Sequence, residues 1–167
     1  MTDDVSEQHA KEFFETYGRA MLAWQYVEDS LFLIFSTLVR GRDHHIVSAV
    51  YHAIVNLNSK LDMITEAMQV AFPETPLFLE WEKLEKAIRS HARNRNILAH
   101  FTLLGSIPKE AEDAVTLRLA RSMYDARHKA HLEPDIKQIA AWDASFGNLG
   151  DKVDAFRRKL ADTQSGV

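Results

Sequence analysis

The segment from Arg93 to His100 combines residue types that bind phosphate and move protons. Arg95 carries a planar fork of N–H donors that matches the oxygens of a phosphate group. His100, five positions later, is a residue type that gains or loses a proton near neutral pH. Asn96 follows the arginine directly and supplies both a hydrogen-bond donor and an acceptor. The pattern therefore indicates a site at which a bound phosphate lies near a proton-transfer group.

Helical geometry predicts how these side chains are distributed around the segment. Five residues of an α-helix turn the side-chain direction by about 140°, so Arg95 and His100 do not share one face. His100 stands four residues from Asn96 and seven from Arg93, which puts these three residues in one strip, with Arg95 reaching in from the side. One helix makes a poor pocket, but two such helices related by a two-fold axis would present the strip twice.

The sequence Arg95-Asn96-Ile97-Leu98-Ala99-His100 resembles the signature of the HEPN superfamily, which is arginine, four to six residues, then histidine, often with asparagine after the arginine. Arg93 and Asn94 match the longer spacing to the same histidine. The resemblance implies a small α-helical bundle that is usually dimeric. Many HEPN proteins are ribonucleases that need no metal or other cofactor, and others have lost catalysis.

The resemblance also implies a reaction and a place for it. The 2′-hydroxyl of RNA attacks the adjacent phosphate, with His100 as general base or acid and Arg95 stabilising charge on the phosphoryl oxygens. Asn96 holds His100 or the phosphate, and the composite site lies at a homodimer interface. The chain departs from some HEPN toxins at Thr102, where those proteins carry tyrosine, and in the long segment after the motif helix.

Two apolar helix seams are each interrupted by polar residues. In the predicted helix 75–104, His91 and Arg95 interrupt the seam Trp81, Leu84, Ile88, Leu98 and Thr102. In the predicted helix 5–39, Glu28 interrupts the seam Tyr17, Met21, Trp24, Leu31, Phe35 and Leu38. We therefore expect a Glu28–Arg95 pair, which either only fixes helix register or also orients an arginine that binds phosphate. Arg93, His91 and Glu28 are thus the predicted supporting residues.

The rest of the pattern predicts an all-α, up-and-down bundle of about five helices in one domain, residues 1–167. Gly41 ends the first helix, Asp43 caps a second that runs to about Ile54, and residues 56–59 form a break before the third. Thr75-Pro76 starts the motif helix, and Pro134 opens the last. Between them, at about 106–132, Leu117 and Leu119 alternate with polar residues. The pattern there allows a small β-hairpin that turns at Tyr124-Asp125 and returns through Ala130 and Leu132, or an irregular or helical insert.

Seven apolar positions repeat at steps of three and four along the last predicted helix, and Ala92 and Ala99 lie one heptad apart on the motif helix. The repeat along the last helix suits bundle packing, and the small side chains of Ala92 and Ala99 would let another helix approach. The seven positions are Ile139, Trp142, Phe146, Leu149, Val153, Phe156 and Leu160.

Composition narrows the classes of function. A net charge of −4 argues against a broad basic surface for nucleic acid. Between Lys83 and His100, however, the motif helix carries five cations and one acidic residue, Glu85; the cations are Lys83, Lys86, Arg89, Arg93 and Arg95. That local charge fits either a small anionic footprint or a solvated helix face. The chain has no cysteine, its first residues are acidic and polar, and no apolar run approaches the roughly 20 residues that span a bilayer. We therefore expect a cytoplasmic protein without a membrane segment.

The histidines outside the motif offer weaker sites. His44, His45 and His52 with Asp43 contain metal-ligand types, but neighbouring residues of a helix point apart. His128 and His131 near Asp125 fall in a predicted turn. We expect no metal at either place.

Three functions remain open at the level of sequence. The first is a HEPN-type endoribonuclease of a toxin–antitoxin, defence or RNA-processing system, with RNA as its substrate. The second is a non-catalytic HEPN-like module that binds a partner protein, such as an antitoxin, or a nucleotide. The third is a regulator in which the Arg–His strip only builds the dimer interface.

Overall fold

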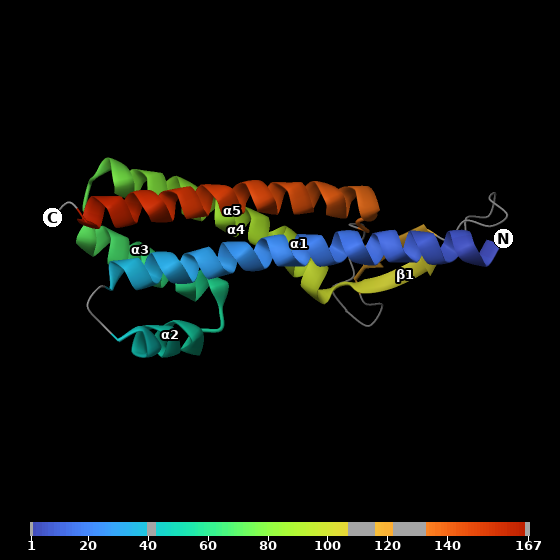
Figure 1. The fold of residues 1–167 in the computed structure, drawn as a ribbon, viewed down its shortest axis with the longest axis horizontal. Coiled ribbons are helices and arrows are strands. Elements are labelled where there is room, and N and C mark those ends of the chain that lie inside the picture. The colour runs from blue at the N-terminus through green and yellow to red at the C-terminus, as the bar shows by residue number, and fades with distance from the viewer. Residues whose placement is uncertain (1, 40–42, 107–115, 122–132, 166–167) are drawn as a thin grey trace. The chain divides into compact units, whose positions relative to one another are not determined.

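The computed structural model describes residues 2–39, 43–106, 116–121 and 133–165 of the chain (Figure 1). It contains five helices: α1 (Thr2–Leu38), α2 (His44–Ala53), α3 (Leu57–Ala71), α4 (Pro76–His100) and α5 (Ile136–Ser165). Two short strands, β1 (Thr102–Ser106) and β2 (Thr116–Ala120), form an antiparallel hairpin. The predicted all-α fold of about five helices with a small insert is confirmed.

The helices begin where the sequence supplies caps. The Asp43 side chain accepts a hydrogen bond from the His45 backbone N–H at 2.7 Å, as predicted for the start of α2. Thr75 Oγ1 accepts from the Phe78 N–H at 3.2 Å, directly before Pro76 opens α4. The predicted break over residues 56–59 is wrong, because Asn56 is itself a cap and α3 begins one residue later. The predicted Gly41 cap lies outside the described residues.

The end of α4 and the hairpin differ from the sequence prediction. The helix ends at His100 rather than near Leu104, because residues 102–106 form β1 and pair with β2. Leu103 lies opposite Leu119 in this register, so the apolar residues that extend the helical pattern belong to a strand. The predicted strand around Leu117 and Leu119 is present, but its partner precedes it in the chain. The predicted return through Ala130 and Leu132 lies outside the described residues.

The chain divides into two compact units, and α1, α4 and α5 contribute residues to both. The first unit comprises Met1–Trp24 and Ala92–Phe146, and the second comprises Gln25–His91 and Gly147–Val167. The predicted seam of α5 is confirmed in full, because all seven of its residues are buried: Ile139, Trp142, Phe146, Leu149, Val153, Phe156 and Leu160.

The core face of α1 is rotated from its predicted position. Trp24, Leu31 and Phe35 are buried as expected, but Ala20, Val27 and Ile34 are buried beside them, whereas Tyr17, Met21 and Leu38 are only half-buried. Glu28 is half-buried too. It therefore lies at the margin of the buried face rather than interrupting its centre.

In the first unit, α1 and α5 run in the same direction. The Trp24 ring packs edge-on against Phe146 with 5.2 Å between ring centroids, and Arg19 Nε lies 3.4 Å from a carboxylate oxygen of Asp143. The order of the contacts along both helices shows the parallel direction. Both partners of the aromatic pair are buried, so the pair joins the two helices through apolar packing.

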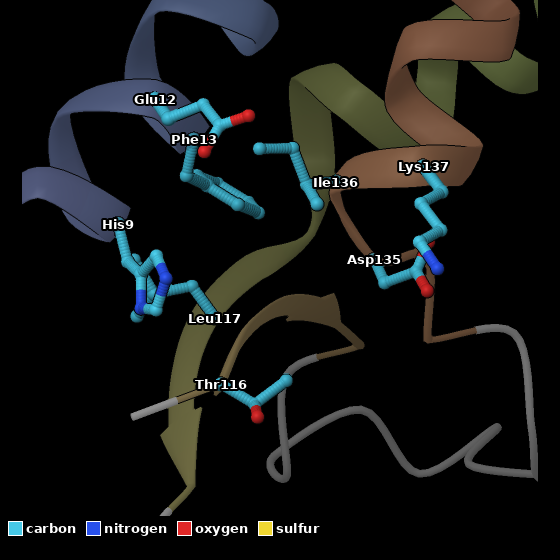
Figure 2. Close-up of a pocket in the computed structure, with 8 residues that line it drawn as sticks. All are labelled: His9, Glu12, Phe13, Thr116, Leu117, Asp135, Ile136 and Lys137. Carbon is cyan, nitrogen blue, oxygen red and sulfur yellow. The ribbon is translucent and has the colours of Figure 1, made fainter. Parts of the chain in front are cut away.

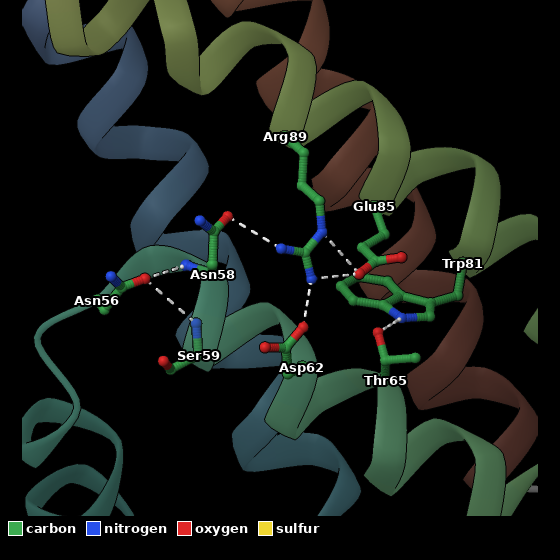
Figure 3. A network of polar contacts seen from close by, with 8 residues as sticks. All are labelled: Asn56, Asn58, Ser59, Asp62, Thr65, Trp81, Glu85 and Arg89. Carbon is green, nitrogen blue, oxygen red and sulfur yellow. Dashed lines mark hydrogen bonds and ion pairs between the residues drawn. The ribbon is translucent and has the colours of Figure 1, made fainter.

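In the second unit, α4 runs antiparallel to both α5 and α3. The rings of Trp81 and Phe156 lie 5.7 Å apart, and Lys159 forms an ion pair with Glu80. On the other side, Trp81 Nε1 donates a hydrogen bond to Thr65 Oγ1 at 2.9 Å (Figure 3). These alternating directions are those of the predicted up-and-down order.

Arg89 ties α4 to α3 through several hydrogen bonds (Figure 3). Its guanidinium donates to Glu85 Oε1 at 2.7 and 3.0 Å on the same helix, to Asp62 Oδ1 at 2.6 Å, and to Asn58 Oδ1 at 2.9 Å. Burial lowers the pKa of Arg89, but the hydrogen bonds and charges of Glu85 and Asp62 outweigh it, so the pKa lies above its ordinary value. The side chain therefore stays charged and is committed to holding the two helices together.

Replacing Arg89 by alanine should lower the free energy of unfolding by about 1–2 kcal/mol, because hydrogen bonds to two carboxylates are lost at a partly solvated position. Urea unfolding followed by circular dichroism measures the change. The control is Lys86→Ala, which removes an exposed cation from the same helix and should cost less than about 0.5 kcal/mol. Equal effects of the two substitutions would show that the Arg89 contacts contribute nothing.

Candidate functional site at the end of helix α4

The predicted site residues Arg95, Asn96 and His100 occupy the last turns of α4, and His100 is its final residue. The Phe101 backbone N–H still donates to the Ile97 carbonyl at 3.0 Å, and one residue later the chain enters β1. The motif thus belongs to a regular helix that ends where the hairpin begins. The first compact unit contains all three residues together with the hairpin.

Two contacts fix the rotation of this part of α4 in the first unit. The Leu98 side chain is only 1% exposed, and Ala92, six residues earlier, is also buried. The Tyr17 hydroxyl donates a hydrogen bond to the Leu98 carbonyl oxygen at 3.0 Å. With Leu98 turned inward, Asn96, Ala99 and His100 face solvent.

Arg95 and Asn96 are the two motif residues that the structure brings into direct contact. Arg95 is half-buried, and its Nη1 donates a hydrogen bond to Asn96 Oδ1 at 3.3 Å. The amide oxygen restricts the guanidinium and leaves the amide nitrogen of Asn96 able to donate to another group. This arrangement suits a pair of donors directed at a phosphate oxygen.

His100 shares an exposed surface with Asn96 and Arg93. All three side chains are exposed, and their spacing places them along one strip of the helix. Histidine in this setting is accessible to a substrate or to a second subunit. Ala99 is exposed beside the strip, whereas Ala92 is buried within the unit, so only Ala99 can receive another helix there.

The predicted supporting residues His91 and Glu28 belong to the second compact unit. His91 is half-buried, and its Nδ1 lies 2.8 Å from the Ala87 carbonyl oxygen. Because a carbonyl only accepts, Nδ1 carries the hydrogen in this contact. The Glu28–Arg95 pair stays a prediction.

The local positive charge of the motif helix is smaller than the sequence suggests. Arg89 is engaged by Glu85 and Asp62, so it does not contribute a free cation to an anion-binding surface. Lys83, Lys86 and Arg93 are exposed. Within the first unit, the positive charge of the motif therefore comes from Arg93 and Arg95.

The candidate metal ligands do not form a site in the described part of the chain, where no group of three or more His, Asp or Glu side chains is placed to hold an ion. Asp43 acts as a helix cap, and His44 and His52 contact the ring of Phe32 at centroid distances of 5.6 and 5.4 Å. Asp125, His128 and His131 lie outside the described residues. Among the helices that the structure describes, none combines the length and apolar character needed to cross a membrane.

Sequence reasoning missed the residues that support the motif from elsewhere in the first unit. Tyr17 bonds the motif helix from 81 positions away, and the guanidinium of Arg121 lies 5.8 Å from the ring centroid of Phe101, next to His100. An apolar seam containing Tyr17 is visible in the sequence, but its hydroxyl partner is not. The Arg121–Phe101 contact depends on the hairpin register, which no local pattern encodes.

Comparison with known proteins adds no relative: no family model, curated protein or solved structure matches this chain. The resemblance of Arg95, Asn96 and His100 to the HEPN signature therefore stays a prediction.

Proposed function

We propose that the protein is a HEPN-like, metal-independent endoribonuclease whose site is completed by a second copy of the chain. The observation that carries the proposal is how the motif residues lie at the end of α4. Arg95 is held against Asn96 at 3.3 Å, while Asn96 and His100 face solvent on the same helix end. A residue type that binds phosphate, Arg95, and a residue type that transfers protons, His100, thus lie within one short segment.

The proposed reaction uses groups that this chain supplies. His100 removes the proton from the ribose 2′-hydroxyl, and the resulting oxygen attacks the adjacent phosphorus. The bond from phosphorus to the 5′-oxygen breaks, and that oxygen takes a proton from an acid, which in a dimer is the partner copy's equivalent of the same histidine. The guanidinium of Arg95 stabilises the negative charge that develops on the phosphoryl oxygens. The products are a 2′,3′-cyclic phosphate and a 5′-hydroxyl.

The second copy is proposed because one α4 offers an exposed strip rather than an enclosed site. Pairing two strips across a two-fold axis would bring two copies of Arg95 and His100 to one substrate and exclude water from it. Ala99 has a small, exposed side chain and permits close approach of a second helix.

The non-catalytic alternative uses the same surface. The strip of Arg93, Asn96 and His100 then binds an anionic partner without cleaving it. Binding of RNA without cleavage would favour this alternative.

Sedimentation equilibrium at micromolar concentration should give a homodimer, with twice the 19.1 kDa mass of the chain. Ala99→Arg should shift the equilibrium toward monomer by at least tenfold, because it places two bulky like charges across the two-fold axis. Gln69→Arg, at an exposed position of α3, adds the same charge away from the strip and should leave the dimer unchanged. A wild-type monomer at these concentrations would rule out the composite site.

Purified protein should cleave single-stranded RNA in the presence of EDTA and leave a 2′,3′-cyclic phosphate. His100→Ala should reduce the rate by at least about 100-fold, the contribution of a general acid or base, while circular dichroism shows an unchanged fold. Arg95→Lys keeps the charge but loses the fork and should also slow cleavage strongly.

The controls are His45→Ala and Arg158→Lys, which change an exposed histidine on α2 and an exposed arginine on α5. Neither should alter the rate. Cleavage that survives His100→Ala would assign the activity to another residue or to a contaminating nuclease.

A further inference from the structure

A cavity of about 260 Å³ lies in the first unit, where β2 meets the start of α5 and the N-terminal part of α1 (Figure 2). Its floor is apolar and consists of Phe13, Leu117 and Ile136. Figure 2 shows the side chains of Phe13 and Ile136 directed toward each other across it. Ligand pockets for drug-sized molecules are larger, at roughly 300–1,000 Å³. The volume therefore suits one small group rather than a peptide or an oligonucleotide.

The rim of the cavity carries both hydrogen-bond acceptors and hydrogen-bond donors. Glu12 from α1 and Asp135 from the start of α5 supply carboxylates, and Lys137 and His9 supply nitrogen donors. One oxygen of Asp135 accepts the backbone N–H of Gln138 at 2.9 Å, and the carboxylate has further lone pairs for a ligand. All four rim side chains are exposed. They can therefore reach a group that sits on the apolar floor.

We propose that this cavity binds a nucleobase with an exocyclic amino group beside a ring nitrogen, as in adenine and cytosine. The flat face of the base would cover Phe13, Leu117 and Ile136. Its amino group has two N–H bonds and would donate one to Glu12 and one to Asp135, the pairing by which carboxylates read the amine of cytosine. The ring nitrogen would accept from Lys137 or His9. Uracil presents carbonyl oxygens in place of the amine, so it would set acceptors against the carboxylates.

The inference rests on the proposed function, because the cavity becomes a substrate subsite only if the chain acts on RNA. β1 begins two residues after His100 and pairs with β2, whose Leu117 lines the cavity opposite Gly105 of β1. A five-residue strand spans about 14 Å, so the hairpin leads from the motif to the cavity over a length that a few nucleotides of single-stranded RNA can cover. The cavity would therefore select the base at one position near the cleaved bond.

The test is an NMR titration of the full chain with adenosine, cytidine and uridine, followed at the backbone amides of Thr116, Leu117 and Lys137. Adenosine and cytidine should shift these signals, and uridine should bind at least tenfold more weakly. Glu12→Gln and Asp135→Asn should each weaken adenosine binding about tenfold, since a charged acceptor is lost. Asparagine still caps a helix, so Asp135→Asn keeps the start of α5.

Glu7→Gln is the matched control, because it removes an exposed carboxylate from α1 outside the cavity and should leave binding unchanged. Equal binding of uridine, absence of shifts with all three nucleosides, or equal effects of Glu7→Gln and Glu12→Gln would overturn the inference. Cleavage assays separate it from the proposed function. Nucleoside binding without RNA cleavage would retain the nucleobase site and reject the ribonuclease, whereas cleavage with no nucleoside binding would retain the ribonuclease and reject the nucleobase site.

Discussion

The hydrogen bond from Tyr17 to the Leu98 carbonyl, together with burial of the Leu98 side chain, sets the rotation of α4 at the end that carries the Arg95–His100 motif. A helix has one rotational degree of freedom about its axis, and a buried leucine removes it. Once Leu98 faces inward, the residues on either side of it must face solvent or the boundary. The exposure of Asn96 and His100 and the half-buried position of Arg95 follow from that single constraint.

Arg89 and Arg95 lie on the same helix, α4, but donate hydrogen bonds to different kinds of group. Arg89 donates hydrogen bonds to two carboxylates and an amide, so its charge is balanced within the contact that joins α3 to α4. Arg95 donates a hydrogen bond to the side-chain amide oxygen of its neighbour Asn96. A chain with a net charge of −4 has little general attraction for nucleic acid, so the proposed binding of RNA depends on such local groups. Two copies of a small basic strip in a dimer would raise that affinity without a broad basic surface.

The sequence predicted what depends on local order and missed what depends on pairing across the chain. The regular spacing from Ile139 to Leu160 specifies one buried face, and every residue of it is buried. The end of α4 was placed too late because Leu103 and Leu104 continue a helical pattern, and only the pairing of β1 with β2 turns them into a strand. The motif residues were predicted from their spacing, and their role stays a prediction. Their support by Tyr17, and the cavity built from α1, β2 and α5, have no local signature.

The central claim is that the end of α4 cleaves RNA through the ribose 2′-hydroxyl, and a DNA oligonucleotide containing one ribonucleotide tests it most directly. With EDTA present, we predict cleavage only on the 3′ side of that ribonucleotide, none in the all-DNA strand, and none after 2′-O-methylation of the single ribose. The ribonucleotide should be adenosine or cytidine in one series and uridine in another, so that base preference does not hide the chemistry. Cleavage of the methylated or all-DNA strand would contradict the account. So would the absence of cleavage at the unmodified ribonucleotide in both the adenosine or cytidine series and the uridine series.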